Sequence, residues 1–98
     1  MTSISDIQQT VCREFGVTMI DLVSQRRGRE IVIPRHVAMW LAAKSTPASL
    51  PKIGRAFGNR DHKTVMNALD RINRRRASDP PFASLIRDLL QTVGGVIA

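Results

Sequence analysis

The sequence predicts an all-α fold, a single compact domain of about six helices that contains a helix-turn-helix. Three observations favour this fold. Apolar residues recur at helical rather than alternating spacing along most of the 98 residues. Serine, threonine or aspartate precedes several of these stretches, and glycine or proline follows several of them. The chain is 43% hydrophobic, which is enough for one packed core, and it is too short for two.

The first two helices are expected at residues 3–15 and 18–23. Ser3 with Asp6 three residues later is typical of a capping box, and Gly16 is expected to end the first helix. Thr18 and Asp21 repeat the capping pattern. One face of the first helix carries Ile4, Ile7, Val11 and Phe15, together with the only cysteine, Cys12, expected to be a small buried hydrophobe.

A basic loop is expected at residues 24–30, where three arginines occupy four positions around Gly28. We expect Arg26, Arg27 and Arg29 to neutralise phosphates. One of them could enter a minor groove, where negative potential is concentrated. The alternative is an ordinary exposed loop.

Residues 31–33 are β-branched and are interpreted as an extended connector, because no second convincing strand exists for them to pair with. Pro34 is expected to start a third helix that runs to about Lys44. Arg35 and His36 would then lie at the helix start, where exposed donors and free backbone N–H groups can meet a phosphate. Trp40 is expected to pack in or beside the core.

The helix-turn-helix is expected at residues 49–76. Leu50, Ile53 and Phe57 give the short first helix an apolar face, and Gly58 can leave it in a left-handed conformation. Asp61 can cap the second helix. The front of that helix carries four polar side chains that can read base edges or hold phosphates: Asp61, His62, Lys63 and Thr64. Arginines near its end either contact a DNA backbone or complement the helix dipole: Arg71, Arg74, Arg75 and Arg76.

The last helix is expected to start at Pro80 with Asp79 as its cap, and to continue to Val93. Its wide apolar stripe comprises Phe82, Leu85, Ile86, Leu89, Leu90 and Val93. The stripe either packs back on the domain or meets a partner. We expect residues 1–93 to form the domain and residues 94–98 to form a flexible tail.

The charge pattern indicates a polyanionic partner. The net charge is +7, and residues 24–76 hold 13 of the 15 basic residues but only 3 of the 8 acidic ones, a local net charge of +10. Aromatic residues make up only 4%, which counts against a platform for single-stranded nucleic acid. Without a signal peptide or a membrane-spanning apolar run, the chain is expected to be cytoplasmic and associated with the nucleoid.

The pattern Leu50-Pro51-x-Ile53-Gly54-x-x-Phe57-Gly58-x-Arg60-Asp61-His62-x-Thr64-Val65 closely resembles the signature of the C-terminal DNA-binding domain of DnaA, the bacterial chromosomal replication initiator. Residues 22–29 and 34–39 are similar to that domain's basic loop and following helix. The resemblance covers roughly residues 4–90. It implies an all-helical, Trp-repressor-like domain that recognises a short duplex element, the DnaA box, in initiation or regulation of replication.

The resemblance also implies residue roles. Arg27 matches the family's minor-groove arginine, and the front of the second motif helix matches its major-groove readers. Together with the residue chemistry, this assigns base reading to Arg27, Asp61, His62, Lys63 and Thr64. Phosphate binding is assigned to Arg26, Arg29, Arg35, His36, Pro51, Lys52, Arg55, Arg60 and Arg71. No catalytic residue, metal or cofactor is expected.

Several positions depart from the family pattern. Lys63 stands where threonine is usual, which changes the base preference expected at the facing position. Asn59 replaces a usual glycine but tolerates a left-handed turn. His36 replaces a longer polar residue. The phosphate-binding loop of the family's ATPase module is absent, so the chain is expected to be a stand-alone relative or a fragment of an initiator. As a stand-alone protein it would occupy sites shared with the full-length initiator.

Two other function classes are alternatives to DNA binding. In the first, the last helix recruits a partner or forms a dimer, and DNA contact is secondary. This interaction module predicts an exposed apolar stripe. An enzyme is the weakest candidate, because the sequence shows no nucleophile–base pair, no carboxylate pair at useful spacing and no metal cluster.

Overall fold

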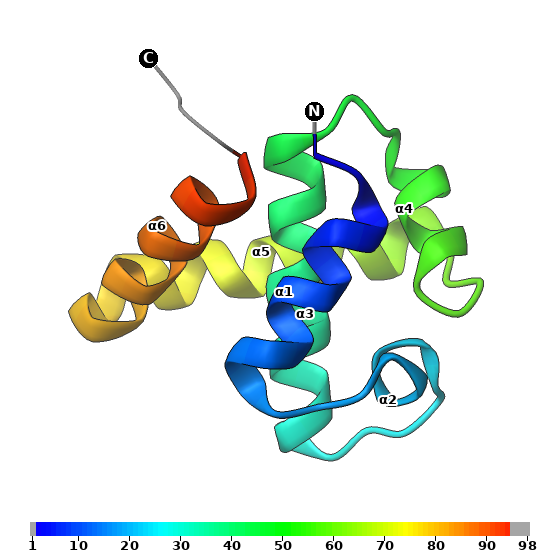
Figure 1. The fold of residues 1–98 in the computed structure, drawn as a ribbon, viewed down its shortest axis with the longest axis horizontal. Coiled ribbons are helices and arrows are strands. Elements are labelled where there is room, and N and C mark those ends of the chain that lie inside the picture. The colour runs from blue at the N-terminus through cyan, green and yellow to red at the C-terminus, as the bar shows by residue number, and fades with distance from the viewer. Residues whose placement is uncertain (1, 95–98) are drawn as a thin grey trace.

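The computed structural model describes residues 2–94 and contains six helices within that range. They are α1 (Ile4–Phe15), α2 (Met19–Val23), α3 (Arg29–Ser45), α4 (Leu50–Ala56), α5 (His62–Ser78) and α6 (Pro80–Gly94) (Figure 1). No strand is present in the part of the chain that the structure describes. The predicted all-α fold is confirmed.

Helix α3 is the centre of the domain and packs against each of the other five helices (Figure 1). Its residues 37–42 are all buried. Around them lies one apolar core that includes Ile7, Val11, Leu22, Ile53, Phe57, Val65 and Ile86. Every helix therefore contributes to a single core. Because α2, α4 and α5 all pack on α3, the loop between α2 and α3 is held close to the same centre as α4 and α5.

The expected helix ends are confirmed at the first two helices. Ser3 and Asp6 form a capping box at α1, and Thr18 and Asp21 form another at α2. Gly16 ends α1 with φ at 68°, in the left-handed region. Cys12 is only partly buried, contrary to expectation. Burial, reinforced by the charge of Asp21, raises the pKa of its thiol.

The expected boundary of the third helix is wrong. Residues 31–33 are helical, and α3 begins at Arg29 with Gly28 as its N-cap. Pro34 lies inside the helix, where its missing N–H leaves the Glu30 carbonyl without the usual partner. Ile31 and Pro34 lie three residues apart and are both buried, so packing on one helical face overrides the β preference of this run.

Trp40 lies in the core, as expected, with 2% of its surface exposed. Its indole N–H donates to the Asn73 side-chain oxygen over 2.9 Å. The Arg76 guanidinium lies 4.7 Å from the ring centroid, and the Lys44 ammonium lies 5.5 Å from it. Trp40 therefore joins α3 to α5 and is not a stacking platform for bases.

Helix α6 packs back on the domain. The Asp79 carboxylate accepts from the Phe82 N–H, and Pro80 is the first helical residue. Phe82, Ile86, Leu89 and Val93 are buried, while Leu85 and Leu90 are partly buried against the core. Gly94 was expected in a tail but is the last residue of α6, and residues 95–98 lie outside the described range.

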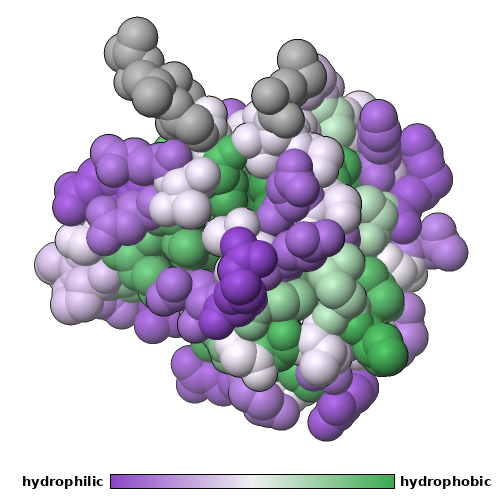
Figure 2. All heavy atoms as spheres, viewed as in Figure 1, coloured by the Kyte–Doolittle hydropathy of each residue, from purple (hydrophilic) through white to green (hydrophobic). Residues whose placement is uncertain are grey.

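Apolar side chains reach the surface mainly on the short helix α2. Met19 is 38%, Ile20 78% and Val23 36% exposed, and Figure 2 shows a hydrophobic area over this helix. The α6 stripe, by contrast, is largely covered. The apolar stripe of α6 is thus buried mainly within the domain itself.

Candidate nucleic-acid interface

The helix-turn-helix is formed by α4, the turn at residues 57–61 and α5. The Ser49 side chain caps α4 by accepting from the Lys52 N–H. Gly58 (φ 86°) and Asn59 (φ 60°) both adopt left-handed conformations, as expected from the sequence. The turn is closed by the Arg60 N–H, which donates to the Gly54 carbonyl over 2.9 Å.

Gly54 allows the turn to lie directly on α4. A Cβ at this position would be 2.0 Å from the Arg60 carbonyl oxygen. Because the two backbones meet here, α5 leaves the turn in a fixed direction relative to α4. The glycine therefore positions the helix whose front carries the predicted base-reading residues.

The front of α5 is exposed to solvent. Asp61 is the N-cap, and the three residues that follow it in the first turn are also exposed: His62, Lys63 and Thr64. One Asp61 oxygen accepts from the Thr64 N–H (2.9 Å) and from the Thr64 hydroxyl (3.1 Å). These bonds lower the pKa of the Asp61 carboxyl, which is therefore ionised at neutral pH and can accept from a base amino group.

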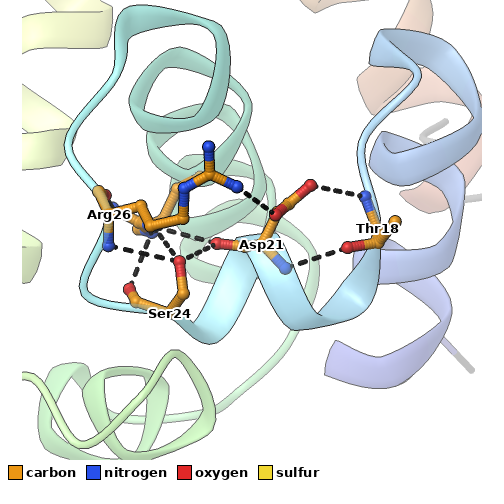
Figure 3. A network of polar contacts seen from close by, with 5 residues as sticks. Thr18, Asp21, Ser24 and Arg26 are labelled. Atoms are coloured by element: carbon orange, nitrogen blue, oxygen red, sulfur yellow. Dashed lines mark hydrogen bonds and ion pairs between the residues drawn. The ribbon is translucent and has the colours of Figure 1, made fainter.

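The basic loop, residues 24–28, lies between α2 and α3. Gln25, Arg26 and Arg27 are exposed. The Arg26 guanidinium pairs with the Asp21 carboxylate at 3.2 Å, and the Arg26 N–H donates to the Ser24 hydroxyl (Figure 3). Figure 3 also shows the Thr18–Asp21 capping contacts beside this pair. The loop thus has a defined conformation and extends Arg27 into solvent.

Arg35 does not have the exposed position that the sequence predicted. It is 3% exposed, because the helix starts five residues earlier than expected and turns this side chain inward. Its guanidinium donates to the carbonyls of Asp21, Leu22, Ser24 and Arg26 over 2.8 to 3.0 Å. Burial lowers the pKa of Arg35, with Arg60 adding to the decrease and Asp21 opposing it. These bonds occupy the donors that a phosphate would need.

His36 also differs from its expected place at a helix start. It is half-buried in the second turn of α3. Burial lowers its pKa from 6.5 to about 4, and the positive charges of Arg71, Arg35 and Arg60 contribute to this decrease. A neutral imidazole at pH 7 can donate one hydrogen bond but does not neutralise a phosphate.

A cationic hollow of about 370 Å³ joins the basic loop to α5. Its walls come from the loop (Gln25, Arg27), from α3 (Val32, Arg35, His36, Met39), from the turn (Arg60) and from α5 (Thr64, Asn67, Arg71). The structure therefore brings Arg27 of the basic loop and Thr64 of the predicted reading helix into the wall of one depression. The concentration of arginines makes this depression suited to a polyanion.

Arg60, in the wall of the hollow, connects the basic loop to the turn of the helix-turn-helix. Its guanidinium donates to the Ser24 carbonyl over 2.6 Å and also to the Phe57 carbonyl. Burial lowers the pKa of Arg60, and the charge of Arg27 lowers it further. Although partly exposed to the hollow, this side chain is engaged with the backbone of both the loop and the turn.

Of the other predicted phosphate ligands, only Arg71 lines the hollow. Pro51, Lys52 and Arg55 are exposed on α4, and Arg29 is exposed at the start of α3. Arg71 is exposed and lines the hollow. Later arginines of α5 have intramolecular partners: Arg74 pairs with Asp70, Arg75 pairs with Asp79 and lies over Phe82, and Arg76 lies over Trp40.

Sequence reasoning missed four residues of the hollow, the apolar Val32 and Met39 and the polar Gln25 and Asn67. Asn67 lies three residues after Thr64 on the same face of α5, so helical spacing from the reading residues could have found it. Gln25 had no such signal, because its place depends on the loop conformation.

Residues 2–94 show neither a cluster of metal ligands nor a helix suited to a membrane. No group of three or more His, Cys, Asp or Glu side chains in this range is placed to hold a metal ion. Among the described helices, none combines the length and the apolar character needed to cross a membrane.

Comparison with known families and proteins gives consistent matches. The family model described as bacterial DnaA protein helix-turn-helix matches residues 4–72. The chromosomal replication initiator protein DnaA of Caulobacter sp. (strain K31) is 44% identical over 93 residues, which cover 95% of this chain and 19% of that protein. The protein of the same name from Lactobacillus delbrueckii subsp. bulgaricus (strain ATCC BAA-365 / Lb-18) is 48% identical over 88 residues, or 90% of this chain and 19% of that protein.

A solved structure shares the fold. A crystal structure of a DNA replication initiation factor superposes with a TM-score of 0.85 at 28% sequence identity, covering 93% of this chain and 28% of that chain. The chain spans about a fifth of the length of the curated relatives it matches.

Proposed function

The chain belongs to the bacterial DnaA protein helix-turn-helix family, and on that premise we propose that it binds duplex DNA at DnaA-box-like sites, in initiation or regulation of replication. The observation that carries the proposal is the cationic hollow, whose wall contains Arg27 of the basic loop and Thr64 at the exposed front of α5. A recognition helix in the major groove and a basic loop at the neighbouring minor groove would use both elements at once.

Base reading is assigned to Arg27 of the basic loop and to the exposed residues at the front of α5. The ionised Asp61 carboxylate can accept from a cytosine amino group, and the His62 ring can contact a thymine methyl. Lys63 can hold a guanine edge or a phosphate, and Thr64 orients Asp61 through its hydroxyl. Arg27 would enter the narrow minor groove, where negative potential is strongest.

Phosphate contacts would position the domain without specifying sequence. The exposed cations available for this role are Arg26, Arg29, Lys52, Arg55 and Arg71, with Pro51 at the start of α4 beside them. Arg60 can add one contact from the wall of the hollow. Arg35 and His36 are not assigned phosphates, because the first is buried and the second is neutral at pH 7.

The alternative interaction module is less well supported. It required the apolar stripe of the last helix to remain exposed, and Phe82, Ile86, Leu89 and Val93 are each at most 5% exposed. The proposed role is therefore binding rather than catalysis or assembly through α6. In a cell, the chain would act in the cytoplasm at the nucleoid.

A selection of random duplexes with the purified chain tests the proposal directly. At near-physiological salt, we expect a motif close to the DnaA box to be enriched. A different motif would mean that Lys63 redirects the reading helix. Failure to enrich any motif would contradict sequence-specific binding and leave only electrostatic attraction to DNA.

The chain would also share sites with a full-length replication initiator. We expect the two proteins to compete for the selected motif, because one domain of this kind fills the grooves of one site. Competition is measured by titrating the chain against the host initiator bound to a labelled duplex. Simultaneous occupation of a single motif would contradict shared recognition.

A further inference from the structure

The conformation of the basic loop depends on one buried side chain, Arg35. The loop has no regular secondary structure and follows the end of α2, so the carbonyl groups of the loop and of the last turn of α2 need partners from elsewhere. Arg35 supplies them from inside the domain. Its Nε donates to the Leu22 carbonyl, Nη1 to the Arg26 carbonyl, and Nη2 to the carbonyls of Asp21 and Ser24.

The planar guanidinium suits this arrangement and an ammonium does not. Four carbonyls at 2.8 to 3.0 Å are contacted by three different nitrogen atoms of one rigid group. A lysine carries a single nitrogen with three donors, so it cannot reach carbonyls that are spread around a guanidinium fork. A lysine does, however, bind a phosphate well as a point charge. Replacing Arg35 by lysine therefore separates the two possible roles. DNA binding is kept if Arg35 holds a phosphate and is lost if Arg35 holds the carbonyl groups of the protein.

One of these four carbonyls, that of Ser24, also connects the loop to the helix-turn-helix. The Ser24 carbonyl accepts from Arg35 and also from Arg60 of the turn, at 3.0 and 2.6 Å. The backbone at Gly58 lies against the end of α2, since a Cβ there would be 2.2 Å from the Val23 carbonyl oxygen. The loop that carries Arg27 is thus fixed relative to the turn that starts α5.

We propose that Arg35 is a positioning residue for DNA recognition, which acts by fixing the basic loop so that Arg27 reaches its groove while α5 occupies the neighbouring one. Arg35 does this without touching DNA. The inference rests on the proposed function, because it assigns to Arg35 a share of the sequence preference of that same interface.

The test is a double-mutant cycle between Arg35→Lys and Arg27→Ala, measured on the preferred duplex and on a random duplex. Arg27→Ala is expected to weaken specific binding roughly 5- to 150-fold, the range for loss of one base contact. Arg35→Lys is expected to cause most of that loss although the charge is kept. The double variant should bind little worse than Arg27→Ala, because Arg35 acts through Arg27.

Arg87→Lys is the matched control, since Arg87 is exposed on α6 and does not line the hollow. It should bind both duplexes like the wild type. Wild-type affinity in a folded Arg35→Lys would overturn the inference, because a lysine can replace a phosphate ligand but not the carbonyl network. Losses that add in the double variant would overturn it as well.

Amide hydrogen exchange without DNA separates this inference from the proposed function. Residues 24–28 should exchange faster in Arg35→Lys than in the wild type. Unchanged exchange in a chain that keeps its sequence preference would overturn the inference and leave the proposed function intact. A wild type without sequence preference would overturn the proposed function, and the inference with it, whatever the exchange rates show. If Arg35→Lys does not fold, Ser24→Ala takes its place in the cycle, because the Ser24 hydroxyl bonds the Asp21 carbonyl and the Arg26 N–H. A loss shared with Arg27→Ala supports the inference, and an additive or absent loss overturns it.

Discussion

Asp61 serves both folding and the proposed recognition with different atoms. One carboxylate oxygen caps α5 through the Thr64 N–H and also accepts from the Thr64 hydroxyl. The carboxylate as a whole is exposed to solvent, so its other oxygen can accept from a base. Since the same capping bonds keep the pKa of the carboxyl low, the cap prepares the acceptor that recognition would need.

His62→Ala is expected to weaken binding to the preferred duplex by about 1–3 kcal/mol and binding to random duplexes very little. The reason is that His62 is exposed in the first turn of α5, where side chains meet base edges. Titration of both duplexes with the variant measures the difference. Met66→Ala, an exposed apolar residue one turn further along, is the control. Equal losses on both duplexes would remove His62 from base reading.

His36 predicts a pH dependence of stability. Its folded pKa, about 4, lies below the ordinary value of 6.5, so the unfolded chain binds more protons between these pH values. The stabilisation is fully present above pH 6.5 and is lost as the pH falls towards 4. After allowance for the partial exposure of the ring, the loss should be on the order of 1–2 kcal/mol. Urea unfolding at pH 7 and 4.5 measures it.

The His36→Gln variant isolates this effect from the titration of carboxylates. It should retain the acid destabilisation due to carboxylates and lack the part due to His36. An identical pH profile in the variant and the wild type would show that burial and the neighbouring arginines do not hold the imidazole neutral.

The site residues that sequence could place are those whose roles depend on local chemistry. Asp61 at a helix start and Arg27 in a crowded basic loop are recognisable without coordinates. Both are exposed, and Arg27 lines the hollow. Arg35 was misplaced because a sequence shows that a residue is charged but not which way it points. Only the true start of α3 determines that its side chain faces inward.

At the scale of elements, Gly54 shows a conflict between helix propensity and tertiary contact. Alanine is favoured over glycine inside a helix by roughly 0.5–1 kcal/mol. Here the added Cβ would lie 2.0 Å from the Arg60 carbonyl oxygen, and backbone cannot move aside as a flexible side chain can. Gly54→Ala should therefore lower the free energy of unfolding by about 2–3 kcal/mol, as overpacking typically does. Denaturant unfolding measures the change.

Gly16→Ala is the control for Gly54→Ala. It places a Cβ in open space, with only the left-handed φ of 68° against it. A loss of about 1 kcal/mol with normal DNA binding is expected. Gly54→Ala, in contrast, should also weaken specific binding, because it shifts the turn that aims α5. A stabilised Gly54→Ala variant would show that the turn can move away from α4.

The predicted helix boundaries succeed where a cap fixes them and fail where packing does. Ser3, Thr18, Asp61 and Asp79 all accept from the backbone at helix starts, as expected from the sequence. Residues 31–33 have no such local signal, and their β-branched side chains favour an extended chain. Their helical state comes from burying Ile31 and Pro34 together. Local propensity alone could not reveal that contact.

At the scale of the whole molecule, charge is distributed unevenly over a single small domain. The basic loop, α3, the turn and α5 bring Arg27, Arg60 and Arg71 to one hollow, whereas the acidic residues are mostly near the two ends of the chain. A field of this kind orients the domain before contact. Binding to any duplex should therefore weaken as salt rises, because each contacted phosphate releases condensed counterions.

Arg71 links that field to a single measurable contact. It is exposed at the wall of the hollow, where burial lowers the pKa of His36 and the charge of Arg71 lowers it further. Arg71→Ala should weaken binding to specific and random duplexes alike and reduce the slope of log affinity against log salt by about 1. Arg87→Ala removes the same charge from α6 and should leave the slope nearly unchanged. Equal reductions in both variants would mean that the net charge of +7 acts as a diffuse cloud and that the hollow is not where phosphates bind.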